Sequence, residues 1–196
     1  MSRKLYFSQR SPFARKVRIL LAEKQLAYEP KQEDLTARSE DFKALSPLGK
    51  VPLLLDEDGT LVFDSTVIAE YLEDRYPNPP VLGKGVKERL CHRAFDELAD
   101  TVADQAVALF FGKDSGASLA KQERQLELAL DELQKRIRDG AVPAEFGLAH
   151  AAVIGALGYL ELRLGSERVT ARPELARFIA PHLTRASELA APPPAP

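Results

Sequence analysis

The first 76 residues combine two patterns of apolar and polar positions. Short apolar runs, typical of strands, are separated by segments whose apolar residues recur every three or four positions, typical of helices. In chain order these patterns predict a strand, a helix, a strand, an irregular helix, two strands and a helix, over residues 4–8, 12–24, 26–32, 33–45, 51–55, 61–63 and 65–76. Asp58–Gly59, between the last two apolar runs, is a strong hairpin signal. A βαβ unit followed by a ββα unit predicts a mixed four-stranded sheet with helices on its faces.

From residue 86 onward the pattern is almost entirely helical. Apolar residues recur at helical spacing over 86–109, and further helices are expected over 118–138, 148–164 and 173–188. The segment 148–164 is rich in alanine and glycine and is apolar on all sides, so we expect it at the centre of a bundle. The second half of the chain therefore predicts an all-α helical domain.

The stretch between the two halves, residues 76–85, holds three prolines and two glycines, which do not sustain a helix. We therefore expect an α/β domain over residues 1–77, a linker over 78–85 and the helical domain over 86–190. The proline-rich tail, 191–196, is expected to be extended or disordered, and no function is assigned to it.

Composition and charge narrow the class of protein. The chain has 196 residues, 45% of them hydrophobic and 29% charged, with a formal net charge of -2. This balance, with no basic run, gives no reason to expect a nucleic-acid partner. The one cysteine, Cys91, excludes an internal disulfide and suits a reducing compartment. No signal peptide or bilayer-spanning run is found, and the three histidines lack metal-binding spacing, so we expect a soluble cytoplasmic protein with no metal and no membrane partner.

Ser11 is the first candidate for chemistry. It precedes Pro12 at the start of a predicted helix that follows directly on a strand. The free N–H groups and positive dipole end of such a helix point at the edge of the sheet, where they stabilise an anion. A serine hydroxyl there can donate a hydrogen bond to a thiolate and favour its ionised form. Serine is also an ordinary helix cap, and the residues alone leave both roles open.

Two further junctions carry polar chemistry. If the Val51–Pro52 bond is cis, the N–H and C=O of Val51 are free to pair with an extended peptide, although only roughly one X–Pro bond in twenty is cis. Asp64 and Ser65 lie where a strand gives way to a helix. There they can hold an ammonium group and a carboxylate, or simply cap the helix.

Taken in this order and at this spacing, the three segments resemble the glutathione transferase superfamily. Residues 11–18 resemble the first active-site segment of its serine-type classes, 47–54 the cis-proline segment, and 63–72 the segment that holds the γ-glutamyl end of glutathione. The resemblance covers residues 4–77 and is looser beyond. It implies a thioredoxin-like N-terminal domain, with glutathione as co-substrate, followed by an all-helical domain.

The resemblance also implies a role for each residue near the sulfur. Ser11 would hydrogen-bond the glutathione thiolate and activate it as a nucleophile. The backbone of Val51 would pair with the cysteinyl part, with Pro52 in the cis form. Lys50 would approach the glycine carboxylate.

The remaining implied roles concern the two ends of the site. Asp64 and Ser65 would hold the ammonium and carboxylate groups of the γ-glutamyl end. Phe13 would lie near the electrophile pocket, whose other wall would come from the helix over residues 86–111. The thiolate would then attack a small electrophile, or reduce a peroxide.

Several functions fit this resemblance. The first is an enzyme, a glutathione S-transferase of unknown substrate. The alternative is a protein of the same fold that binds a protein partner without catalysis, like the stringent starvation proteins; a third is a glutathione-binding protein whose substrate is unknown or lost. Retention of all three site segments favours glutathione binding. Superfamily members pair as two-fold dimers, so a homodimer is expected.

Rival residues and one departure complete the picture. Tyr6 and Ser8 compete with Ser11 as thiol activators, but Tyr6 lies inside a strand, where packing is expected. Cys91 is expected to be a small buried apolar residue.

At the start of the helix over 148–164 the family's Ser/Thr-x-x-Asp capping box is replaced by Gly147 and His150. We expect this replacement to cost about 1 kcal/mol unless a partner compensates.

Overall fold

The computed structural model describes residues 2–112 and 116–193. The N-terminal half forms β1 (Lys4–Phe7), α1 (Pro12–Glu23), β2 (Glu29–Gln32), α2 (Glu40–Leu45), β3 (Leu53–Leu55), β4 (Leu61–Val62) and α3 (Ser65–Arg75). The strands form one sheet in the order β2-β1-β3-β4, in which β1 is parallel to β2 and antiparallel to β3, and β3 is antiparallel to β4. The predicted mixed four-stranded sheet is confirmed, with strands shorter than the apolar runs that predicted them.

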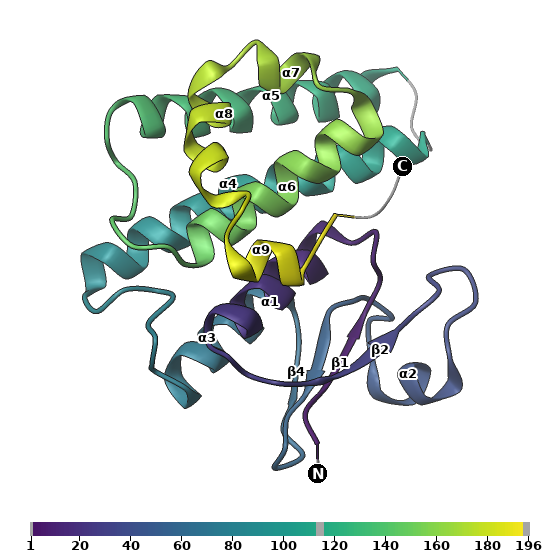
Figure 1. Cartoon of the computed structure of the whole chain (residues 1–196). Coiled ribbons are helices and arrows are strands. Elements are labelled where there is room, and N and C mark those ends of the chain that lie inside the picture. Colours follow the sequence, from purple (N-terminus) through teal and green to yellow (C-terminus); the bar gives the residue numbers. More distant parts are fainter. Residues whose placement is uncertain (1, 113–115, 194–196) are drawn as a thin grey trace.

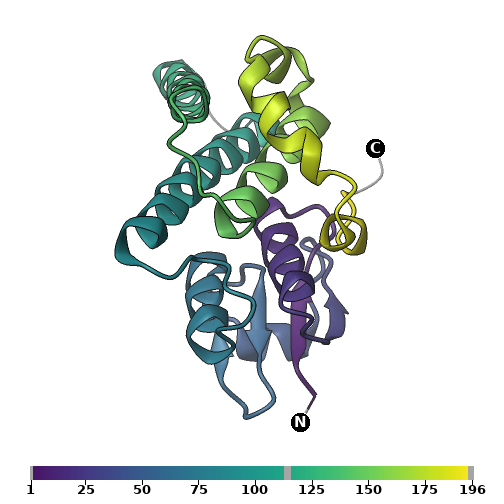
Figure 2. The ribbon, with the colours of Figure 1, turned by 60° about the vertical axis from the view of Figure 1, so that its left-hand side comes forward.

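Alternation along β1 sends its side chains to two different layers. Leu5 and Phe7 belong to a core shared with α1 and α3, whereas Tyr6 packs with Leu53 and with Phe42 of α2 on the other face. Figures 1 and 2 show α1 and α3 side by side on one face of the sheet, between the sheet and the helical domain. Because α1 is covered on both sides, most of its residues are buried.

The second half is the predicted helical domain. Its helices are α4 (Val86–Phe111), α5 (Ala117–Arg138), α6 (Leu148–Leu164), α7 (Glu167–Thr170), α8 (Pro173–Ile179) and α9 (Ala186–Ala190), with a 3-10 turn, η1 (Ala180–His182). Twelve of the 17 residues of α6 are buried, as expected for the central helix. It also packs closely on α1, since a Cβ added at Gly155 would lie 3.0 Å from the carbonyl oxygen of Pro12. None of the helices in the described part of the chain has both the length and the apolar character that a bilayer crossing needs.

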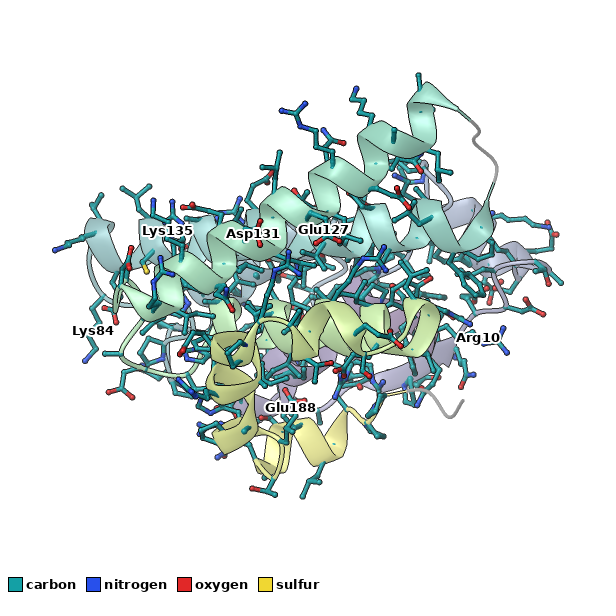
Figure 3. All side chains as sticks on the ribbon, turned by 90° about the horizontal axis from the view of Figure 1, so that it is seen from above. Arg10, Lys84, Glu127, Asp131, Lys135 and Glu188 are labelled. Atoms are coloured by element: carbon teal, nitrogen blue, oxygen red, sulfur yellow. The ribbon has the colours of Figure 1, made fainter. Side chains whose placement is uncertain are left out.

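The helices α5, α7 and α8 are joined at the surface by ion pairs. Arg172 contacts Glu127 at 2.6 Å and Asp131 at 2.7 Å, and Arg168 contacts Glu127 at 2.8 Å. Figure 3 shows Glu127 and Asp131 on α5, seen from above the helical domain. The carboxylates of Glu127 and Asp131 therefore hold α5 against α7 and α8.

The prediction of a single last helix over residues 173–188 is wrong. The chain instead forms α8, the turn η1 and α9. Pro181 explains the break, because proline has no N–H to continue the helical hydrogen bonds and its ring clashes with the preceding turn. The short helix α7 was not predicted either.

The segment after the break turns back onto α1, beside which α9 lies in Figure 1. The Arg15 guanidinium donates to the carbonyl oxygen of Ala191 at 3.0 Å and contacts the Glu188 carboxylate at 3.0 Å. Burial raises the pKa of Glu188 to about 7, against the smaller opposing effect of Arg15. Ala191, expected in the extended tail, is fully buried. Residues 194–196 of that tail lie outside the described residues.

The N-terminus of α6 shows why glycine stands at position 147. The Leu148 N–H donates to the carbonyl oxygen of Val81 at 2.8 Å, so the linker lies directly against the helix start. A Cβ added at Gly147 would lie 2.1 Å from that same oxygen. Glycine is required here for space, because any side chain would displace the linker.

Two histidines replace the capping box that the sequence lacks. His150 Nδ1 accepts from the Gly147 N–H at 3.3 Å, and His92 Nδ1 accepts from the Ala149 N–H at 3.1 Å. Both imidazoles are buried, and burial lowers the pKa of His92, and that of His150 to about 3. Neutral imidazole nitrogens thus satisfy helix-end donors that a serine and an aspartate would satisfy in the family pattern.

Candidate functional site

The topology of the sheet brings the three predicted segments to one edge. β1 and β4 run in the same direction, because each is antiparallel to β3. The carboxyl ends of β1 and β4 therefore lie beside the amino end of β3. Ser11 follows β1, Val51–Pro52 precedes β3, and Asp64–Ser65 follows β4. The pairing of Tyr6 with Leu53 sets Pro52 opposite the end of β1.

Ser11 caps α1, as one of its two possible roles requires. Its Oγ accepts a hydrogen bond from the Ala14 N–H at 3.2 Å, and the residue is 8% exposed. A hydroxyl has two acceptor positions and one hydrogen. Capping uses an acceptor position only, so the O–H stays able to donate to an anion at the helix N-terminus. The two roles are therefore compatible in one geometry.

The second segment forms the middle of the edge. The Val51–Pro52 bond is cis, Pro52 is buried and Val51 is half-buried against the cluster of Tyr6 and Leu53. Lys50 is exposed, and its charge offsets part of the effect of burial, which raises the pKa of Asp104 in α4.

The third segment is the start of α3. Asp64 caps the helix, and its Oδ1 accepts from the N–H groups of Thr66 at 3.1 Å and Val67 at 3.2 Å. Ser65, the first helical residue, is 3% exposed. Within the described residues, the Ser65 N–H is the N–H of the first turn that does not donate to Asp64. An incoming carboxylate at this helix end would meet that N–H and the positive end of the dipole.

A buried charge network that the sequence did not predict lies beneath the edge. Lys16 Nζ contacts Asp96 at 2.6 Å and Asp100 at 2.8 Å, and the Thr66 hydroxyl donates to Asp96 at 2.8 Å. Burial raises the pKa of Asp100 to about 6, against the opposing effect of Lys16. These contacts tie α1, α3 and α4 together. The helical spacing of Lys16 between the apolar Phe13 and Leu20 was the signal that it faces inward.

The rival residues have other surroundings. The Tyr6 ring lies 5.9 Å from that of Phe42, and burial raises the pKa of its hydroxyl. Burial also raises the pKa of the half-buried Cys91, whose Sγ donates to the carbonyl oxygen of Ala141. Neither change favours an ionised oxygen or sulfur. Ser8 uses its backbone carbonyl to accept from the Ser11 N–H at 3.0 Å.

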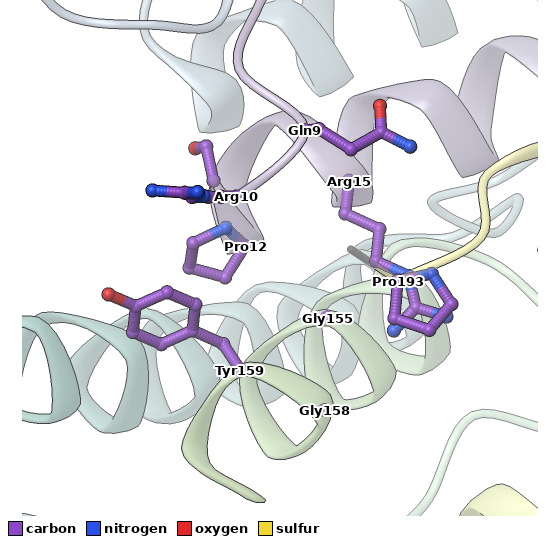
Figure 4. Close-up of a pocket in the computed structure, with 9 residues that line it drawn as sticks. Gln9, Arg10, Pro12, Arg15, Gly155, Gly158, Tyr159 and Pro193 are labelled. Carbon is purple, nitrogen blue, oxygen red and sulfur yellow. The ribbon is translucent and has the colours of Figure 1, made fainter. Parts of the chain in front are cut away.

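A crevice opens from Ser11 toward the helical domain. It runs between the start of α1 and the middle of α6, with Arg10 and Tyr159 at one end and Arg15 and Pro193 at the other (Figure 4). Phe13, in the first turn of α1, packs against the core of the helical domain. The edge that carries Ser11 therefore continues into a space bounded by both domains.

Known proteins share this architecture. Residues 5–80 match the model described as "Glutathione S-transferase, N-terminal domain". The chain is 33% identical over 199 residues to the uncharacterized GST-like protein YibF of Escherichia coli (strain K12), covering 97% of this chain and 98% of that protein. A glutathione S-transferase structure from Methylobacillus flagellatus KT with GSH bound has a TM-score of 0.90 at 34% identity, covering 98% of this chain and 100% of that one. A shorter match, 41% identical over 78 residues, covers 40% of this chain and 36% of a stringent starvation protein A homolog of Haemophilus influenzae.

The match to YibF extends over almost the whole of both chains, and the sheet and the helical domain have the order of the family. The chain therefore belongs to the glutathione S-transferase family.

Proposed function

We propose that this protein binds glutathione at the edge formed by β1, β3 and β4. The observation that carries the proposal is the topology, which joins a capping serine, a strand-leading Val51–Pro52 and an Asp64–Ser65 helix start at one place. The related structure from Methylobacillus flagellatus, which contains GSH, supports it. The match to stringent starvation protein A covers 40% of this chain and 36% of that protein, and the site segments are intact in this chain, which favours glutathione over the protein-partner alternative.

Each group of glutathione has a chemically matched partner at this edge. The γ-glutamyl carboxylate binds the Ser65 N–H and hydroxyl, and its ammonium group lies beside Asp64. The cysteinyl backbone pairs with the N–H and C=O of Val51, as an added strand does. The exposed Lys50 takes the glycine carboxylate.

The sulfur then lies at the N-terminus of α1, where Ser11 donates a hydrogen bond to the thiolate and lowers its pKa. The thiolate forms a bond to an electrophilic carbon, and the electron pair leaves with the displaced group. Phe13 and α4 flank the electrophile. We propose that this conjugation is the reaction, in a reducing cytoplasm, with no metal required.

The test must separate capping from thiolate stabilisation. Replacing an N-cap serine by glycine costs only a few tenths of a kcal/mol, whereas alanine costs about 1 kcal/mol. Ser11→Gly should therefore melt close to the wild type but lose about 10- to 100-fold in kcat/KM with a model aromatic halide, the range expected for a hydrogen bond to a charged group. Ser8→Ala is the matched control and should keep the activity.

Calorimetry with glutathione tests the binding itself. Wild-type protein should bind glutathione at millimolar concentration, and Ser65→Ala should bind it more weakly. An absence of binding overturns the proposed function. Intact binding with unchanged turnover in Ser11→Gly overturns only the role of Ser11.

We also propose a homodimer through the face that α3 and α4 share. Arg89 of α4 forms ion pairs with Glu70 and Asp74 of α3, so the two helices lie together. Beside these pairs Val67 and Leu90 are 50% and 63% exposed, more than large apolar residues usually are. A second copy of the chain would cover them.

A further inference from the structure

The basic residues near the start of α1 differ in whether their charge is matched. Arg15 contacts the Glu188 carboxylate at 3.0 Å. Lys16 contacts Asp96 at 2.6 Å and Asp100 at 2.8 Å. The first turn of α1 contains no acidic residue of its own. The charges of these two cations are therefore matched by carboxylates from the second half of the chain.

Arg10 is the exception. It is exposed and lies in the turn that the Ser11 N–H closes by donating to the carbonyl oxygen of Ser8 at 3.0 Å. Within the part of the chain that the structure describes, no carboxylate forms an ion pair with Arg10. Hydrogen bonds from Thr36 lower the pKa of the exposed Asp34, and Arg10 adds only the smallest of the effects that act on it. The charge of Arg10 is therefore unmatched at the N-terminus of α1.

Arg10 and Ser11 border the same small space. Both line the crevice, whose volume of about 10 Å³ has room for about one water molecule (Figure 4). None of the residues that line it is an aspartate or glutamate. The proposed position of the glutathione sulfur is at the Ser11 hydroxyl, so a guanidinium beside that hydroxyl adds a full positive charge to the partial charge of the helix dipole. An opposite charge within roughly 4–6 Å favours the ionised form of a titrating group.

We propose that Arg10 is a second thiolate-stabilising residue, which acts through its positive charge while Ser11 acts through its hydrogen bond. The inference rests on the proposed function and adds a residue to the same reaction. The thiol of bound glutathione releases its proton to solvent, and the thiolate lies beside both the Ser11 hydroxyl and the Arg10 guanidinium. Because Arg10 is exposed, salt screens its effect, whereas a direct hydrogen bond from Ser11 is screened much less.

The test measures the ionisation of the bound thiol directly. The ultraviolet absorbance of the thiolate in the glutathione complex is followed against pH, with the S-methylglutathione complex as the blank. Arg10→Gln should raise the thiol pKa by about 1, the lower end of the range for one neighbouring charge, because the side chain is exposed. Arg10→Lys keeps the charge and should restore most of the effect. Arg124→Gln removes a charge from an exposed position on α5 and should leave the thiol pKa unchanged.

Two further measurements separate an effect of charge from an effect on structure. S-methylglutathione has no proton on its sulfur, so calorimetry should show that Arg10→Gln binds it as tightly as the wild type does. In about 1 M salt, where the Debye length is about 3 Å, the difference in thiol pKa between the wild type and Arg10→Gln should shrink. The difference made by Ser11→Gly should persist. A thermal melt of each variant checks that it is folded.

The outcomes distinguish this inference from the proposed function. If neither glutathione nor S-methylglutathione binds the wild type, the proposed function fails and the role of Arg10 fails with it. If both bind but the thiol pKa is the same in the wild type and in Arg10→Gln, only the role of Arg10 is overturned. That role is also overturned if Arg10→Lys behaves like Arg10→Gln, or if Arg10→Gln weakens binding of S-methylglutathione, because either result shows that Arg10 does not act through its charge on the sulfur.

Discussion

The capping of α6 by neutral histidines makes a pH-dependent prediction. His150 accepts a hydrogen bond from the Gly147 N–H, and its ring stacks against Phe178 at 4.8 Å and contacts His182 at 4.8 Å. A protonated imidazole has no acceptor nitrogen. It would also be a charge buried beside His92, His182 and Arg185, which help burial to lower the pKa of His150. Protonation of His150 is therefore coupled to loss of the native structure.

The sign and size of the effect follow from the two pKa values. The pKa of His150 is about 3 in the folded protein and 6.5 in the unfolded chain. Between these values the unfolded chain binds the proton and the native protein does not, so stability falls as the pH falls from 6.5 towards 3. At about 1.4 kcal/mol per pKa unit, His150 alone removes about 2 kcal/mol between pH 7.5 and pH 5. His92 acts in the same direction.

Two carboxyl groups, the buried Glu188 and the half-buried Asp100, act in the opposite direction. The pKa of Glu188 is raised to about 7 and that of Asp100 to about 6, so in each case the native protein binds the proton first. Their burial costs stability at neutral pH, and this cost is relieved as the pH falls below their native pKa values. The pH profile of the wild type is thus a sum of opposing effects, and only a difference between two proteins isolates His150.

The assay is urea unfolding of wild type and His150→Gln at pH 7.5 and pH 5, followed by circular dichroism because the chain has no tryptophan. Glutamine keeps an acceptor but does not titrate. The stability advantage of the wild type should shrink by about 2 kcal/mol at pH 5. Phe178→Leu, which loosens the same stack without removing a titrating group, should show little such change. An advantage that is the same at both pH values refutes the linkage between His150 and the fold.

Two other predictions concern packing and assembly. Gly147→Ser should destabilise the protein by about 1–3 kcal/mol, because its Cβ would meet the carbonyl oxygen of Val81. The control Gly85→Ser, at the open N-cap of α4, should be neutral or stabilising. Thermal melts compare the two variants, and equal melting temperatures would refute the steric account. Leu90→Glu should give a monomer by light scattering at micromolar concentration. The control Leu128→Glu, at a similarly exposed position on α5, should leave the dimer intact. A monomeric wild type would refute the homodimer.

Most of the N-terminal domain could be predicted because its signals are local. Strand-length apolar runs, the Asp58–Gly59 turn and the Ser11–Pro12 helix start each report on a few neighbouring residues. The strand order places the ends of β1 and β4 on either side of the start of β3. The sequence assigned the three segments to one site only through the resemblance to the glutathione transferase superfamily.

The features that escaped prediction depend on partners distant in sequence. The helical spacing of Lys16 indicates that it faces inward, but its partners Asp96 and Asp100 lie across the domain interface and no local pattern identifies them. From the sequence, His150 indicates that the helix cap is lost, and only the position of its ring shows that its Nδ1 replaces the cap. The break at Pro181 is a different kind of error, because a proline inside a helical pattern is itself a local signal of a break. The helical apolar spacing over 173–188 was given more weight than that signal.

The position of Ser11 depends on both domains. Ser11 lies at the N-terminus of α1, and two neighbouring cations on that helix are held by the second half of the chain: Arg15 by Glu188 and Ala191, and Lys16 by Asp96 and Asp100. Removing one partner of a buried ion pair leaves an uncompensated charge and costs several kcal/mol. The helical domain thus does more than supply a wall for the electrophile. It fixes the helix whose N-cap is Ser11.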